Sequence, residues 1–375
     1  MFNLRNLRLM LSNLPGWRTN RHILVFESDD WGSIRMPSKE TFNSLVNKGL
    51  PLSLGDSGPY NLYDTVANPE DLSGLFEVLS NVKDHYGNPC AFTAISVAAN
   101  PDFERIKNGD FENYYYEPFT VTLRRYYGNN DSFELWKEGI RNKLFVPQFH
   151  GREHLNVSEW MRALKRGDRE THLAFEHGMW GFPNKPYNGS SVSYQAAFDF
   201  YDPEDLAVHD KIIADGLNLF ESIFGYRAVF FVPPNGYLHD SLYKAASENG
   251  IRYLFASRFH STPAGYGKIN KSIHFIGQRN KLGQRFIIRN CFFEPCMKGK
   301  DWVNSCLNDI DMAFRWNKPA IISSHRVNYI GALDPGNREN GLSQLKQLLK
   351  EVVSRWPDVE FMTSAELGDL IQKSN

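Results

Sequence analysis

Cysteine is scarce in this sequence. The four cysteines among the 375 residues are Cys90, Cys291, Cys296 and Cys306, and none stands in a Cys-x-x-Cys pair. Thiols that are so few and so widely spaced exclude a scaffold built from disulfides and the usual cysteine-rich zinc sites. We therefore expect reduced, buried thiols, which fits a cytoplasmic protein.

An excess of charge of one sign is also missing. The formal net charge is -1, and the sequence contains no long run of basic residues. Proteins that hold nucleic acids by their phosphates carry basic patches, so a nucleic acid is not an expected partner.

Long apolar runs are absent as well, and none reaches the roughly 20 residues of a bilayer-spanning helix. Asparagines and arginines interrupt the N-terminal segment, so it does not have the pattern of a secretory signal. Leu4, Leu7, Leu11 and Leu14 recur at helical spacing, which predicts an amphipathic helix within residues 1–20. Such a helix would dock on the protein's own surface or lie on a membrane surface.

The sequence does contain a series of short apolar segments that end in polar or glycine-rich residues. Apolar runs of this length predict strands that are covered on both faces, as in a parallel sheet. Amphipathic helical patterns lie between them, and the alternation predicts an α/β fold with a barrel as its architecture. We expect one decorated domain over residues 21–375. The predicted strands begin at His22, Cys90, Leu144, Ala228, Ile251, Arg285, Ala320 and Val359.

Two connections show little periodicity. Residues 102–143 and 178–200 are rich in Tyr, Asn, Gly and Phe. We expect long irregular loops there, and loops of this kind on a compact fold often carry function.

The acids and histidines follow the predicted strands. Asp29 and Asp30 come after the first strand, His150 and His154 after the third, and His325 after a strand near the end. The carboxyl ends of parallel strands meet on one face of the sheet, where sites are built. These five side chains are therefore expected to converge.

The types of these residues suit a catalytic metal. A spacing of four would place His150 and His154 on one side of a helical turn, and two histidines with one carboxylate leave positions for water. Adjacent aspartates do not usually both reach one ion, so one of Asp29 and Asp30 would bind metal while the other acts as a base. A turn or a helix cap is the plain alternative for this pair.

In their order, four segments resemble the motifs of the NodB-homology polysaccharide deacetylases, also called carbohydrate esterase family 4. ESDDWG at 27–32 resembles the paired-aspartate first motif, and HGREH at 150–154 resembles the His-x-x-x-His second motif. VPPNG at 232–236 is similar to the third motif, usually Arg-Pro-Pro-Tyr-Gly, and SSHR at 323–326 resembles the last motif. The resemblance implies a distorted (β/α) barrel of the glycoside hydrolase/deacetylase type with long loop insertions.

The resemblance also implies a reaction, which is removal of N- or O-acetyl groups from a sugar or polysaccharide precursor with one divalent metal. Zinc fits the ligands, although iron, cobalt, nickel or manganese could take a two-histidine, one-carboxylate site. The implied roles are metal ligand for Asp30, His150 and His154, catalytic base for Asp29, general acid for His325 and oxyanion donor for the Asn235 N–H. The side chains expected to contact the acetylated sugar are Trp31, Trp180 and Pro234.

Two alternatives remain open beside deacetylation, namely hydrolysis of another non-peptide C–N bond and a catalytically silent glycan-binding protein. Two departures from the family pattern bear on the silent alternative. The fourth motif, usually an Asp-rich stretch ending in Trp, is not recognisable, and FASR, ending at Arg258, stands in its place. The third-motif arginine, which orients the base, is replaced by Val232. A buried base needs a cation beside it, and we predict that Arg258, at the end of a neighbouring strand, takes this place.

Overall fold

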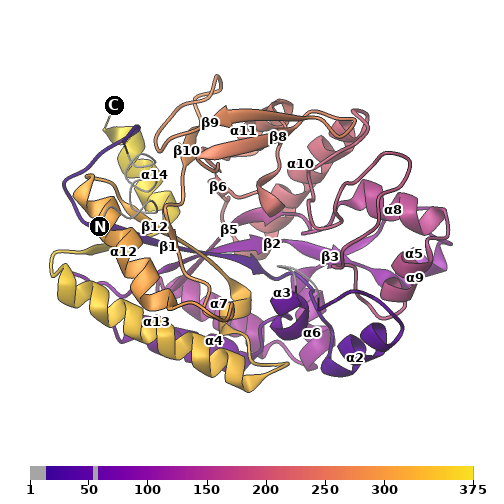
Figure 1. Ribbon diagram of the computed structural model, residues 1–375, viewed down its shortest axis with the longest axis horizontal. Helices are drawn as coiled ribbons and strands as arrows, with labels where there is room; N and C mark the ends of the chain where they lie inside the picture. The colour runs from indigo at the N-terminus through magenta and orange to yellow at the C-terminus, as the bar shows by residue number, and fades with distance from the viewer. Residues whose placement is uncertain (1–13, 54–57, 375) are drawn as a thin grey trace.

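The computed structural model describes residues 14–53 and 58–374. Figure 1 shows strands gathered at the centre with helices packed around them. The strands are β1 Ile23–Trp31, β2 Phe92–Val97, β3 Ala99–Pro101, β4 Tyr116–Pro118, β5 Phe145–Gly151, β6 Phe230–Phe231, β7 Tyr253–Phe255, β8 Phe259–Pro263, β9 Ile269–Ile273, β10 Arg285–Ile287, β11 Cys291–Phe292, β12 Ala320–His325 and β13 Glu360–Met362. The helices are α2 Lys39–Asn47, α3 Gly58–Tyr63, α4 Pro69–Ser80, α5 Phe103–Asn108, α6 Phe119–Tyr127, α7 Asp131–Arg141, α8 Val157–Lys165, α9 Arg169–Phe175, α10 Asp205–Phe224, α11 Tyr243–Glu248, α12 Trp302–Arg315, α13 Pro335–Arg355 and α14 Ser364–Lys373. Short 3₁₀ turns are η1 Pro234–Gly236, η2 Asp240–Leu242 and η3 Arg326–Tyr329.

One curled, nine-stranded sheet organises the chain. Its strand order is β10-β7-β6-β5-β2-β1-β12-β11, and β13 also pairs with β1. All of these pairings are parallel. The predicted class, a parallel α/β fold of the distorted (β/α) barrel type, is confirmed.

The sheet stays open between its two outermost strands. β10 and β11 lie at opposite ends of the strand order and do not pair with each other. Only residues 288–290 separate them along the chain, and each residue spans at most about 3.6 Å. The two edges therefore lie close together, and this three-residue link, here called the seam, bridges them.

Strand β1 explains why the sheet carries both an apolar core and a polar site. Side chains alternate between the two faces of a strand. Leu24 and Phe26 pack in the cluster under α4, α7, α12 and α13, while Ile23 and Val25 belong to the cluster on the other face. Toward the carboxyl end that second face continues as Glu27, so apolar packing gives way to polar groups along one strand.

Of the two connections expected to be irregular loops, one differs from the structure. Residues 102–143 were expected to form a loop, but they contain α5, β4, α6 and α7, because aromatic side chains take the buried positions of short helices. Residues 178–200 are irregular, as expected, with one isolated bridge at Tyr187.

Other expectations concern the cysteines and the N-terminus. All four cysteines are free and buried, as expected. For the amphipathic helix over 1–20, residues 1–13 lie outside the described residues, and residues 14–20 form bends without a helix. Among the described residues, no helix has the length and apolar character to cross a membrane.

The tightest backbone approach joins α13 to η3, the turn that directly follows His325. A Cβ added at Gly341 would lie 1.7 Å from the Asn328 carbonyl oxygen. Gly341→Ala should therefore push α13 from the turn and lower the free energy of unfolding in urea by about 3 kcal/mol or more, since overpacking typically costs about 1–3 kcal/mol. Ser343→Ala, at an exposed position of the same helix, is the control and should change it by less than about 0.5 kcal/mol. Equal stability of the two variants would contradict the close approach.

Candidate metal centre and active site

A cleft of about 570 Å³ opens at the carboxyl ends of the strands. Most of the predicted strand-end residues line it. The residues that line the cleft are Asp29, Asp30, Arg35, Tyr60, His150, His154, Gln195, Val232, Pro233, Asn235, Gly236, Tyr237, Phe255, Ser257, Phe259, His260, Ser261, Arg289 and His325. The structure thus brings together the aspartates and histidines on which the prediction of a site depended.

The paired aspartates both reach this cleft because β1 is irregular at its end. The register with β2 shifts between Ser28 and Trp31, which marks a bulge. Asp30 has a φ of 74° in the left-handed region, and aspartate tolerates this conformation better than most residues. The bulge re-aims Asp30, so that two neighbouring carboxylates serve one site.

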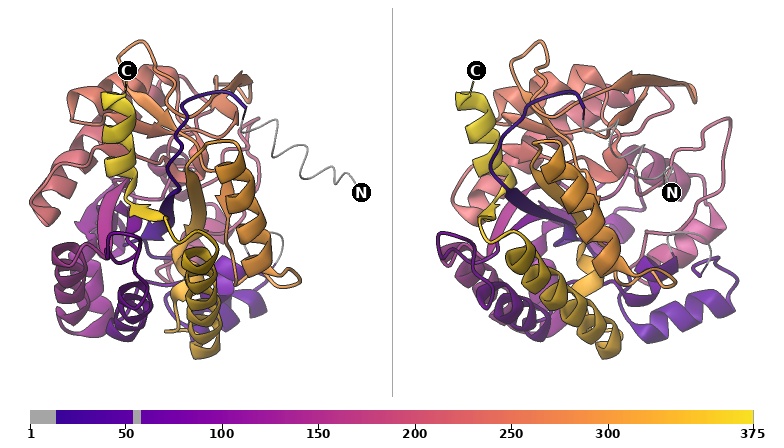
Figure 2. Two further views of the ribbon diagram at one scale, coloured as in Figure 1. Left: turned by 90° about the vertical axis from the view of Figure 1, so that its left-hand side faces the viewer. Right: turned by 60° about the vertical axis from the view of Figure 1, so that its left-hand side comes forward.

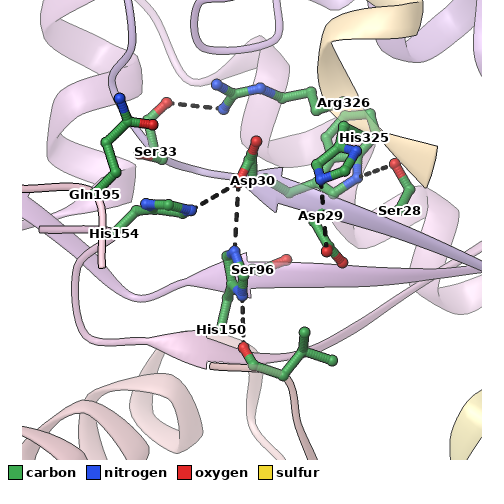
Figure 3. Close-up of polar contacts among 12 residues, drawn as sticks. Ser28, Asp29, Asp30, Ser33, Ser96, His150, His154, Gln195, His325 and Arg326 are labelled. Atoms are coloured by element: carbon green, nitrogen blue, oxygen red, sulfur yellow. Dashed lines mark hydrogen bonds and ion pairs between the residues drawn. The ribbon is translucent and has the colours of Figure 1, made fainter. Parts of the chain in front are cut away.

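Asp30 is the centre of a buried triad with His150 and His154. One carboxylate oxygen lies 3.3 Å from His150 Nε2 and 3.1 Å from His154 Nε2, and Figure 3 shows both rings pointing at it. Three donor atoms bound tetrahedrally at about 2.1 Å would stand roughly 3.4 Å apart. The three residues could therefore hold a divalent ion with little movement.

The hydrogen bonding of His150 fits the same use. Its Nδ1–H donates to the Val232 carbonyl oxygen at 2.6 Å, which leaves the Nε2 lone pair facing Asp30. Histidines that bind metals commonly donate their other N–H to such a carbonyl. Nδ1 of His154 is buried and has no hydrogen-bond partner among the described residues. The His154 ring is held instead by packing against Trp180, whose ring lies nearly parallel to it with the two ring centres 6.1 Å apart.

The two histidines do not share a helical turn, contrary to the prediction. His150 ends β5, and His154 lies in the irregular segment before α8. Gly151 turns the chain between them with a φ of 126°, a conformation that side chains rarely adopt. The two histidines, four residues apart, thus come from the end of a strand and from a loop.

The charge states of the triad also suit a metal. Burial alone would raise the pKa of the Asp30 carboxyl, but His154 and His150 outweigh it and hold the pKa well below its usual range. Burial lowers the pKa of His154 despite the nearby carboxylate. Metal ligands must be an ionised carboxylate and neutral imidazoles, and these two groups favour those forms.

Asp29 belongs to a different set of contacts, centred on Arg289 in the seam. Two guanidinium nitrogens of Arg289 donate to the two Asp29 oxygens at 2.6 Å each, and Nε donates to Glu27 at 2.5 Å. Arg289 also donates to the hydroxyl of Ser323 at 3.2 Å. All four residues are largely buried, so Arg289 compensates two carboxylates that would otherwise be costly to bury.

Arg289 sets the charge of its two partners differently. Burial raises the pKa of the Asp29 carboxyl, but the charge and hydrogen bonds of Arg289 outweigh burial and leave it below its usual value. For Glu27, burial outweighs Arg289 and the pKa is raised. Asp29 is therefore the carboxylate that stays ionised and is fixed by a two-point contact.

His325 stands opposite Asp29. Parallel pairing of β1 with β12 puts the two residues in register, and His325 Nε2 lies 3.9 Å from Asp29. The other ring nitrogen donates to Glu294 at 2.6 Å. Burial would lower the pKa of His325, but Glu294 first and then the two aspartates raise it to about 10. The imidazole is thus held as a cation at neutral pH, at the edge of the cleft.

Asn235 lies across the cleft from these groups, in η1. Its φ of 55° is in the left-handed region, and it is exposed at the cleft. Among the described residues no hydrogen bond uses its backbone N–H. This N–H is available to a ligand, as an oxyanion donor must be.

The three predicted sugar contacts are not placed as expected. Trp31 is 1% exposed and packs edge-on against Trp136 and Phe145. Trp180, also 1% exposed, backs His154. Pro234 is buried and Pro233 lines the cleft instead. Trp31 and Trp180 are not exposed to contact a sugar as expected, because these aromatic side chains fill the core, where they bury the most apolar area.

The predicted cation was also wrong. Arg258 donates to the His274 carbonyl oxygen at 3.0 Å and does not line the cleft, so Arg289 takes its place beside Asp29.

The sequence analysis did not identify Glu294 or Glu27 as site residues, although alternation along β1 puts Glu27 on the same face as Asp29. Arg289 did carry a signal, because it follows a predicted strand just as Asp29 and His325 do.

Comparisons with known proteins give remote likenesses. No family model matches the sequence, and a search of curated proteins finds no relative. Solved structures match over nearly the whole chain. A probable polysaccharide deacetylase from Pseudomonas aeruginosa is 10% identical, with 94% of this chain and 91% of that chain covered and a TM-score of 0.46.

Two further matches represent other activities. PuuE allantoinase is 11% identical, with 96% of this chain and 93% of that chain covered and a TM-score of 0.46. A CE4 family pseudoenzyme from Bacillus anthracis is 10% identical, with 93% and 66% covered and a TM-score of 0.37. At this distance the function has to be inferred from the residues of the site.

Removal of Arg289 should have a large effect on stability. In Arg289→Gln, two buried carboxylates lose their cation, so the free energy of unfolding should fall by about 3–5 kcal/mol. Arg258→Gln is the matched control, since its guanidinium contacts only a carbonyl oxygen among the described residues, and it should lose less than about 1.5 kcal/mol. Chemical denaturation at pH 7 measures both, and equal losses would show that Arg289 has no special role.

Proposed function

We propose that this protein is a metal-dependent hydrolase that removes an acetyl group from a nitrogen or oxygen of a sugar or polysaccharide precursor. The observation that carries the proposal is that two adjacent aspartates make different contacts. Asp30 joins two histidines in a triad fit for a metal, while Asp29 is fixed as a carboxylate by Arg289 and faces a cationic histidine. A metal site, a base and an acid thus share one cleft.

The proposed hydrolysis requires the metal site, the base and the acid. When bound at Asp30, His150 and His154, a divalent ion would polarise the acyl carbonyl and lower the pKa of water. Asp29 is placed to accept the proton of the attacking water as a general base. The Asn235 N–H would donate to the developing oxyanion.

His325 completes the proposed reaction. An amine is a poor leaving group unless it is protonated as the bond breaks, and a charged imidazole at the cleft edge can supply that proton. The Glu294 carboxylate stabilises the protonated form of His325 and, through its hydrogen bond to Nδ1, fixes the orientation of the ring. Base and acid stand 3.9 Å apart, so after product release a water molecule can return the proton from one to the other.

The other two hypotheses are weighed by the same residues. Hydrolysis of another non-peptide C–N bond would use the same base, acid and triad, so only the substrate distinguishes it. The silent glycan-binding hypothesis depended on the loss of the third-motif arginine at Val232. Arg289 supplies a cation to the base from another strand end, which favours an active enzyme. Acetate release from a panel of N- and O-acetylated sugars, with amides and ureides alongside, tests the proposal, and no turnover of any by metal-loaded protein would refute it.

Metal binding should depend on the triad. Purified protein should bind about one divalent ion per chain, and His150→Ala or His154→Ala should weaken that binding strongly. His274→Ala, at a histidine outside the cleft lining, is the control and should bind the ion normally. Titration with zinc or cobalt followed by elemental analysis measures this, and full occupancy in both triad variants would exclude the assigned site.

The two aspartates should separate by role. Asp30→Asn should lose metal and turnover together. Asp29→Asn should keep the metal and lose turnover by about two to four powers of ten, the usual contribution of a general base. Parallel measurement of metal content and kcat distinguishes them, and loss of metal from both variants would mean that the aspartates act as one unit.

Glu294 should set the pH range of activity. The carboxylate raises the pKa of His325, so Glu294→Gln should lower that pKa and move the alkaline fall of kcat to lower pH. Glu351→Gln, at an exposed ion pair on α13, should leave the profile unchanged. A profile of kcat between pH 6 and 11 checks this, and an unmoved alkaline limb would remove His325 from the role of acid.

A further inference from the structure

Arg35 is a buried arginine that has no role in the proposed reaction. Its residue is 6% exposed and lines the cleft. The backbone on both sides of it is fixed, since Ile34 N–H donates to the Asn100 side chain at 2.8 Å and Met36 N–H donates to the Asp64 carbonyl oxygen at 3.0 Å. The side chain therefore stands on a rigid support at the wall of the site.

The guanidinium of Arg35 has no anionic partner among the described residues. Nη2 donates to Gln195 Oε1 at 2.8 Å, and Nε is buried without a hydrogen bond. A buried cation is costly unless it is paired. Other buried arginines follow this rule with carboxylate partners: Arg152 with Glu153 and Asp215, Arg289 with Glu27 and Asp29, and Arg326 with Asp64. Arg285 contacts only neutral oxygens, but it does not line the cleft.

The surroundings of Arg35 hold the guanidinium without an ion pair among the described residues, although the charge of Asp64, which is paired with Arg326, also acts on it. The guanidinium lies over the Tyr60 ring at 5.1 Å. On another side Gly181 lies beside it, since a Cβ there would be in ordinary van der Waals contact with Nη1 at 3.4 Å. Gln195, which accepts the hydrogen bond from Arg35, also lines the cleft with His154 (both are labelled in Figure 3), and its amide nitrogen makes no hydrogen bond to the described residues. Arg35 and Gln195, which both line the cleft, therefore each keep N–H donors that make no hydrogen bond to the described residues.

We propose that the substrate carries an oxyanion, a carboxylate or a phosphate, which Arg35 binds with the Gln195 amide beside it. This inference rests on the proposed function and names the class of its substrate, an acidic acylated sugar. The Tyr60 ring that contacts Arg35 also meets the His325 ring edge-on at 5.4 Å. An anion at Arg35 and a leaving group at His325 thus lie within reach of one small substrate. A guanidinium suits this use because its fork of donors matches carboxylate and phosphate oxygens.

The test uses three probes that differ only at C6 of one sugar: N-acetylglucosamine, its 6-phosphate and its 6-carboxylate. Calorimetry on the metal-loaded full chain gives the Kd of each, and acetate release is followed separately. The phosphate or the carboxylate should bind at least about tenfold more tightly than the neutral sugar, and the one that does identifies the anion. Added salt should weaken the charged probe and leave the neutral one nearly unchanged.

Variants assign the preference to Arg35. Arg35→Gln should reduce it to about threefold or less, and Arg35→Lys, which keeps the charge but not the fork, should retain part of it. Arg258→Gln, which removes an arginine outside the cleft lining, should keep the full preference. The inference fails if neither anion binds more tightly than the neutral sugar to the unmodified protein, or if the preference survives in Arg35→Gln.

Binding and turnover separate the two proposals. Tight binding of an anionic probe without release of acetate or any other acyl product would keep the anion site and overturn the deacetylase. Release of acetate with no preference for charge would keep the deacetylase and overturn the anion site.

Discussion

The contact of Arg289 with Asp29 and Glu27 is the interaction on which the site depends. Two buried carboxylates on the inner face of β1 are stabilised by one guanidinium that reaches both, and the Ser364 hydroxyl also donates to Glu27. The same residue belongs to the seam, where the sheet lacks a strand pairing. Arg289 thus links the two edges of the sheet to the ionised base on β1.

Much of the site could be predicted from one rule, that parallel strands end on a common face. This rule brought Asp29, Asp30, His150, His154 and His325 together before any coordinates were known, and the structure places all five in one cleft. It works because apolar strand segments are local features of the sequence. The parallel α/β architecture follows from the same segments. The strands that the sequence does not predict include the short β11 and the strands β8 and β9, whose polar residues give no continuous apolar run.

The remaining features depend on long-range geometry. Whether Arg258 or Arg289 meets Asp29 is decided by the curl of the sheet, which no local pattern records. The left-handed turn at Asp30 is equally invisible, since its cost is offset by contacts with residues far along the chain. Aromatic abundance misled for a related reason, because a tryptophan in the core and a tryptophan on a sugar platform look alike in sequence. Trp31 and Trp180 proved to be packing residues.

The position of β1 has a consequence for how the chain is made. Among the described residues β1 is the earliest strand in the chain, yet it lies in the middle of the sheet and pairs with β2, β12 and β13, as Figure 2 shows by the indigo strand beside strands from the orange and yellow end. β12 begins only at Ala320. At synthesis rates of about 5–20 residues per second, one edge of β1, whose first four residues are apolar, would wait for β12 for roughly 15–60 seconds. Nascent chains of this protein should therefore need chaperone protection until most of the polypeptide has been released.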